Sequence, residues 1–104
     1  MVNRSIVIKS TGEVIRKDLE KLPTLDELQK VVGGYIELIP HFETYLGEKC
    51  IALCNEDGKL NNLPFNSTAT VAWIKNSSSD FIIDDMLVGD VVIIIGDKKF
   101  LSEF

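Results

Sequence analysis

The sequence predicts a single α+β domain over residues 1–104, built on a mostly antiparallel sheet. Three observations favour this class. About five to seven short apolar or β-branched segments have the length of strands. Short connections that contain glycine join neighbouring segments, as they do in hairpins. Two segments at most have helical spacing, which is too few for a regular alternation of parallel strands and helices.

The first predicted unit is a β-hairpin. Residues 5–9 and 13–17 are rich in β-branched side chains, and the short segment 10–12 between them contains Gly12. A short connection of this kind joins two antiparallel strands.

The next segment predicts a helix over residues 24–32. Thr24 and Glu27 have the spacing of a capping box, in which each side chain binds the other's free backbone N–H. Apolar side chains recur on one face at Leu25, Leu28, Val31 and Val32. Gly33 and Gly34 then end the helix, because glycine adopts a positive φ without a Cβ clash.

Two further strands and a turn follow. Residues 35–39 predict a strand that ends at Pro40, with Tyr35, Glu37 and Ile39 on one face. Residues 50–54 are apolar on both faces, so this strand is expected to lie inside the sheet. The sequence Asn-Glu-Asp-Gly at 55–58 predicts a turn.

A short second helix is predicted over residues 67–75. Asn66 is a suitable N-cap residue, and Ala69, Ala72 and Trp73 share a helical face. The competing interpretation is a strand over residues 70–74, which contain several β-branched side chains.

The C-terminal part is predicted to contain three strands after a loop at residues 76–80. They cover 81–83, the strongly apolar run 91–95, and a short edge strand within 98–104. Phe100, Leu101 and Phe104 are expected to pack on the core or on a second copy, because exposed apolar clusters mark interfaces. A homodimer is therefore the preferred assembly.

The composition disfavours several classes of protein. The chain is 45% hydrophobic, and its eleven basic and sixteen acidic residues give a formal charge of −5. Direct nucleic-acid binding is not expected, since it requires clustered lysine and arginine. The longest apolar run is five residues, far below the ~20 that span a bilayer. With no secretory leader visible, a cytoplasmic protein without a membrane partner is expected.

No catalytic or metal-binding motif is evident, and no cofactor is expected. Cys50 and Cys54 are not in Cys-x-x-Cys spacing. On one strand their Cα atoms would lie ~13 Å apart, too far for a disulfide, so both are expected in the core. His41 is the single histidine of the chain, and no motif for a catalytic triad or a His-ligated metal includes it, so it is expected at the surface or at the rim of a site. The acidic residues Asp84, Asp85, Asp90 and Asp97 lie near turns but lack calcium-loop spacing, so a solvated acidic loop is expected there.

Eight residues near the joints of the predicted fold form a candidate ligand site. They are Tyr35, Glu37, Asn55, Glu56, Lys59, Asn66, Thr70 and Trp73. Their amides, hydroxyls and ammonium could orient a small polar ligand, and the two aromatic rings could stack on a base. A purely structural role for these residues is favoured over a ligand site. The turn accounts for Asn55, helix capping for Asn66, and solvated strand faces for Glu37 and Lys59.

Four motifs carry a family resemblance. They are Gly33-Gly34-Tyr35-Ile36-Glu37, Asn55-Glu56-Asp57-Gly58-Lys59-Leu60, Leu63-Pro64-Phe65-Asn66 with Ala69-Thr70, and Val88-Gly89-Asp90-Val91-Val92-Ile93. In this order, the chain resembles the family catalogued as domain of unknown function 3846, found in phages, plasmids and bacterial genomes. The resemblance implies an accessory protein of phage or mobile-element type. Asn55 departs from the family pattern, because an acidic residue is common at this position in the family.

The resemblance and the lack of a catalytic constellation favour a non-enzymatic binding protein. It would hold a host protein or a small nucleotide-like ligand in the host cytoplasm, with counter-defence as one role. Two alternatives stay open. One is a small hydrolase or transferase that uses carboxylates such as Glu37 and Glu56, and the other is a structural or assembly component of a phage particle.

Overall fold

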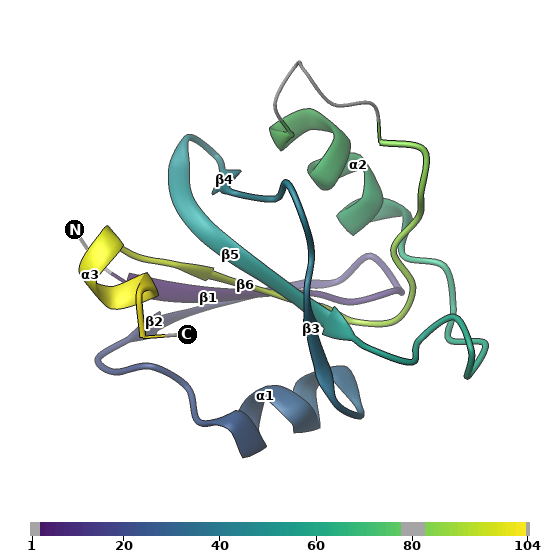
Figure 1. Cartoon of the computed structure of the whole chain (residues 1–104), viewed down its shortest axis with the longest axis horizontal. Coiled ribbons are helices and arrows are strands. Elements are labelled where there is room, and N and C mark those ends of the chain that lie inside the picture. Colours follow the sequence, from purple (N-terminus) through teal and green to yellow (C-terminus); the bar gives the residue numbers. More distant parts are fainter. Residues whose placement is uncertain (1–2, 78–82, 104) are drawn as a thin grey trace.

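The structure, a computed structural model, describes residues 3–77 and 83–103. The described strands are β1 (Asn3–Ile8), β2 (Val14–Leu19), β3 (Ile36–Leu38), β4 (Thr44–Tyr45), β5 (Glu48–Asn55) and β6 (Val91–Ile95). They form one sheet in the order β2-β1-β6-β5-β3, and β4 pairs with the first residues of β5 (Figure 1). The pairings between these strands are antiparallel. The predicted α+β class and mostly antiparallel sheet are therefore confirmed.

The last strand in the sequence lies at the centre of the sheet. β6 pairs with β1 on one side and with β5 on the other. Its side chains are buried on both faces, and none of the five is more than 2% exposed. An uninterrupted run of valine and isoleucine suits this position, because both faces of the strand must be apolar.

Helices cover the two faces of the sheet. On one face lies α1 (Leu25–Val32), whose Leu28 and Val32 pack in a cluster with Leu53, Val92 and Ile94. On the other lies α2 (Ser67–Asn76), whose Ala69 and Trp73 pack in a second cluster with Ile6, Ile8 and Ile93. Figure 1 shows the sheet between these two helices.

The predicted start and end of α1 are confirmed. The Glu27 N–H donates to Thr24 Oγ1 over 3.2 Å, and the Thr24 N–H donates to Glu27 Oε1 over 3.3 Å, which completes the capping box. Gly33 ends the helix with φ 78°, a left-handed conformation that favours glycine.

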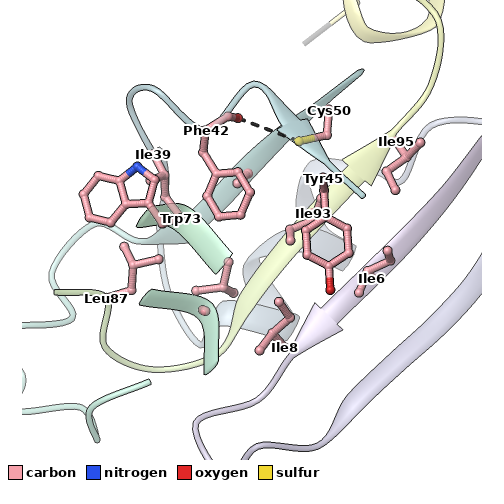
Figure 2. Close-up of a cluster of buried hydrophobic side chains, with 13 residues drawn as sticks. Ile6, Ile8, Ile39, Phe42, Tyr45, Cys50, Trp73, Leu87, Ile93 and Ile95 are labelled. Atoms are coloured by element: carbon pink, nitrogen blue, oxygen red, sulfur yellow. Dashed lines mark hydrogen bonds between the residues drawn. The ribbon is translucent and has the colours of Figure 1, made fainter. Parts of the chain in front are cut away.

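The core beneath α2 contains a residue from an irregular segment. Residues 39–43 connect β3 to β4 without forming a strand of their own, and Phe42 of this segment enters the core with 2% exposure. Figure 2 shows Phe42 among Ile39, Trp73 and the isoleucines of β1 and β6, with the Cys50 thiol donating to its carbonyl oxygen. The Trp73 indole N–H donates to Pro40 O over 2.8 Å and holds this segment against α2.

The expected C-terminal edge strand is wrong, and the expected maximum of two helices is wrong with it. Residues Lys98–Leu101 form a third helix, α3, because the Asp97 carboxylate caps its first turn by accepting from the Phe100 N–H over 2.8 Å. Leu101 is 8% exposed and joins the cluster beneath α1, so the tail packs on the core. Phe104 lies outside the described residues.

Of the strand expected at 81–83, the described part of the chain includes one residue, Ile83. Ile83 belongs to no strand, and residues 81–82 lie outside the described part of the chain. The loop predicted at 76–80 begins one residue later than expected, at residue 77, because Asn76 is the last residue of α2. Residues 78–80 of that loop also lie outside the described part.

Candidate ligand-binding cleft

A cleft of about 450 Å³ lies where the C-terminal end of β5 meets β3. Its walls come from four segments, which can be followed in Figure 1: residues 37–40, the end of β5 with the turn at 54–60, α2, and residues 85–88. A volume of this size is typical of small-ligand sites in proteins.

The cleft has an apolar floor and a charged rim. Ile39, Trp73 and Leu87 supply floor side chains that are 3–6% exposed. The lining side chains that carry charge are exposed, and they are Glu37, Glu56, Asp57, Lys59 and Asp85. An apolar floor with a few polar groups above it can exclude water from a ligand while orienting it.

The rim carries a net negative charge. Its four carboxylates and one ammonium leave a formal charge of −3. The ammonium of Lys59 is already engaged, because it forms an ion pair with the Asp85 carboxylate across the cleft wall. This bond, together with the Met86 N–H, holds the pKa of Asp85 below its usual range, so the carboxylate stays ionised at neutral pH.

The sequence profile of one protein family, described as domain of unknown function (DUF3846), matches residues 3–102. The chain belongs to this family. A search of curated proteins found no match to the chain, and a search of solved structures found none either.

The cleft of this DUF3846 domain contains one thiol, that of Cys54. Burial raises its pKa to about 11, and the nearby Glu37 carboxylate adds to the shift. The group is therefore protonated at neutral pH and is a poor nucleophile. Cys50 lies in the core, where burial raises its pKa to about 12. The expectation of two core cysteines holds for Cys50, whereas Cys54 is half-buried at the cleft.

Five of the eight candidate residues line the cleft of the DUF3846 domain: Glu37, Asn55, Glu56, Lys59 and Trp73. The side chain of Asn55 is nevertheless engaged at both ends. Its Nδ2 donates to Val32 O over 3.1 Å, and its Oδ1 accepts from the Asp57 N–H over 2.8 Å. Asn55 therefore fastens the end of α1 to the turn that forms one cleft wall.

The other three candidates, Tyr35, Asn66 and Thr70, are not among the residues that line the cleft. Tyr35 is 69% exposed at the edge of the sheet. Asn66 is fully buried: its Nδ2 donates to Ile8 O and Gly89 O, and its Oδ1 accepts from the Ala69 N–H.

The hydroxyl of Thr70 extends this buried network. It donates to Asn66 O over 2.8 Å and accepts from the Leu87 N–H over 2.9 Å. Asn66 and Thr70 thus hold α2 against β1 and against the segment that carries the cleft wall at 85–88. Their role in this geometry is to position the wall, because their polar atoms already have partners.

The wall at residues 85–88 was missed in the sequence, where Asp85 was assigned to a solvated acidic loop. Long-range pairing places it: Phe65 and Val88 form a β-bridge, and the Gly89 N–H donates to Pro64 O over 2.7 Å. A Cβ at Gly89 would lie 2.8 Å from Leu63 Cδ1, so glycine permits this close approach. In the sequence, the signal for this pairing is the presence of two motifs, Leu63-Pro64-Phe65 and Val88-Gly89-Asp90.

The described ranges, 3–77 and 83–103, contain no group of three His, Cys, Asp or Glu side chains arranged to hold a metal ion. Within these ranges, no helix combines the length and the apolar character needed to cross a bilayer.

Proposed function

We propose that this DUF3846 domain is a non-enzymatic binding protein of phage or mobile-element type that acts by occupancy. The observation that carries the proposal is the cleft itself, with a buried apolar floor of Ile39, Trp73 and Leu87 beneath a charged rim. The family resemblance supports the phage or mobile-element context. A counter-defence role would follow if the bound molecule belongs to the host.

The arrangement of the polar groups supports holding a ligand over transforming it. The lining thiol, Cys54, is protonated at neutral pH. The amide of Asn55 is committed to internal hydrogen bonds. The groups left to meet a ligand are carboxylates at the rim, such as Glu37 and Glu56, which serve well as fixed charges.

The charge of the rim favours a protein partner over a nucleotide-like ligand. A phosphate in the cleft would meet more carboxylates than ammonium groups, and Lys59 is already paired with Asp85. Each uncompensated contact at 4 Å costs about 1 kcal/mol even in water. An uncharged or cationic group is therefore the better match, and the side chains of a host protein can supply one.

The experiment that tests this proposal is thermal unfolding in the presence of separate ligand panels. The panels are nucleotides, polyamines, free amino acids and random 12-residue peptides. A ligand at 100 times its Kd stabilises the folded state by about 2.7 kcal/mol. We expect at least one panel to raise the Tm of the wild type and to lose that effect in Glu56→Lys.

The matched control is Glu20→Lys, which makes the same charge change at an exposed position outside the cleft. Its response should equal that of the wild type. If no panel stabilises the protein, or if Glu56→Lys and Glu20→Lys respond alike, the cleft is not the binding site.

The second candidate function is a small hydrolase or transferase, because Glu37 and Glu56 line the same cleft. Paired carboxylates can act as general acid and base. Turnover of a panel of ester and phosphoester substrates, lost in the folded double variant Glu37→Gln, Glu56→Gln, would support this candidate over occupancy. Turnover that survives in the double variant removes these two residues from the role.

A further inference from the structure

We propose that the partner is an extended segment of another protein, which pairs with the open edge of β3 and places a basic side chain at the acidic rim of the cleft. This inference rests on the proposed function and names the class of its ligand. It follows from the backbone geometry of β3, the exposure of its side chains and the charge beside it.

The backbone of β3 has hydrogen-bonding groups that point away from the sheet. The Ile39 N–H donates to Ala52 O, and the Tyr35 carbonyl oxygen accepts from the Glu56 N–H, each over 2.8 Å. Since inward and outward groups alternate along an antiparallel strand, the N–H and C=O groups of Ile36 and Leu38 point outward. Among the described residues, no strand pairs with that side of β3.

The open edge is also apolar and exposed. Tyr35 is 69% exposed and Leu38 is 58% exposed. The opposite edge of the sheet differs, because β2 carries exposed charged side chains at Arg16, Lys17 and Asp18. Charged side chains protect an edge strand from pairing, and β3 has this protection only at Glu37.

An added strand would lie directly beside the cleft. Glu37 pairs with Cys54 of β5, and both residues line the cleft. A residue opposite Glu37 on the added strand would have its Cβ about 4.5–5.5 Å from that of Glu37, on the same face of the sheet. A lysine or arginine there would reach the carboxylate of Glu37 and the rim beyond it.

The charge argues against a second copy of this chain as the occupant. In a symmetric antiparallel pairing that uses the outward groups of both Ile36 and Leu38, each Glu37 lies opposite the Glu37 of the other copy. Like charges directly opposite each other destabilise a strand pair. The formal charge of −5 on each chain adds to the repulsion. A basic segment has the complementary charge.

The test begins with an mRNA-displayed library of random 12-residue peptides, selected on the full chain. We expect enriched peptides to contain a lysine or arginine flanked by β-branched residues. Their affinity should fall about tenfold in Leu38→Pro, which removes one outward N–H. The matched control, Leu38→Ala, keeps that N–H and should weaken binding less. Glu37→Arg should also weaken binding, because it reverses the charge at the rim.

Amide hydrogen exchange of the wild type gives a second readout, which does not depend on whether Leu38→Pro folds. The amides of Ile36 and Leu38 should gain at least tenfold protection when a selected peptide binds. No gain at these two amides, or equal binding by Leu38→Pro and Leu38→Ala, would overturn strand pairing. Enrichment of acidic peptides, or no effect of Glu37→Arg, would overturn the basic partner.

Three further outcomes bear on both this inference and the proposed function. If a small ligand occupies the cleft and no peptide is enriched, the inference is wrong and the cleft proposal stands. If peptides bind the β3 edge without sensitivity to Glu56→Lys, the cleft is not part of their site. If neither peptides nor small ligands bind, both proposals fail.

Discussion

A Cβ at Gly34 would lie 2.8 Å from Nδ2 of Asn55, the atom that donates to the Val32 carbonyl. The two adjacent glycines therefore have different roles. Gly33 is needed for its φ of 78°, whereas Gly34 is needed because another side chain occupies the space. This contact joins the end of α1 to the turn after β5.

Gly34→Ala is expected to destabilise the protein by about 1–3 kcal/mol, since the added methyl group overpacks the site. In an Asn55→Ala background the same change should cost less, with a coupling of at least about 0.5 kcal/mol. Urea unfolding of the four proteins in the cycle measures the coupling. Additive effects would contradict the contact, and Gly33→Ala, whose Cβ meets no other residue, serves as the uncoupled control.

Asn66→Ala is expected to cost about 3 kcal/mol or more of unfolding free energy. The change removes an N-cap and leaves the buried carbonyls of Ile8 and Gly89 without their donor. Asn61→Ala, at an exposed position, should stay within about 0.5 kcal/mol of the wild type. A small effect of Asn66→Ala on unfolding would mean that the network does not position the cleft wall.

The ion pair between Lys59 and Asp85 should make a small contribution to stability that depends on pH and salt. Both side chains are about half exposed, so a double-mutant cycle should give no more than about 1 kcal/mol at low salt. The pKa of Asp85 is lowered from 3.8, so the contribution is present above that value and is lost as the pH falls through the lowered pKa. A coupling energy that stays unchanged in 1 M salt, or once the Asp85 carboxylate has been protonated, would contradict this assignment.

The raised pKa of Cys54 predicts slow labelling at neutral pH and a loss of stability in alkali. The folded state favours the protonated thiol, so its contribution is present below pH 9.0 and is lost as the pH rises towards about 11. The stability decrease between pH 8 and pH 10.5 should be smaller in Cys54→Ala than in the wild type. Rapid reaction of Cys54 with a disulfide reagent at pH 7 would show a thiolate and argue for chemistry in the cleft.

Local patterns predicted the elements whose determinants lie close together in the sequence. The spacing of Thr24 and Glu27 with Gly33 fixed both ends of α1. The β-branched run 91–95 identified a fully buried strand, although its place at the centre of the sheet depends on pairing with residues far along the chain. For α2, the capping residue Asn66 outweighed the β-branched residues that favoured a strand.

Elements that depend on tertiary contacts were not predictable in the same way. The composition of residues 98–104 predicts a short strand. The Asp97 cap and the close contact of Phe100 with Gly96 instead favour a helix over residues 98–101. In the cleft, Glu37, Glu56 and Lys59 were selected as exposed polar residues near joints. Leu87 and Asp85 were missed, because pairing across more than twenty residues brings their segment to the cleft.

The central claim is that a partner occupies the cleft, and Trp73 gives the most direct measurement of it. Trp73 is the single tryptophan of the chain, and it lines the cleft floor. An NMR titration with a stabilising ligand or a selected peptide should shift the indole N–H resonance and the backbone amides around Glu37 and Glu56 in a saturable way. A ligand that binds by calorimetry but leaves these resonances unchanged would contradict the account.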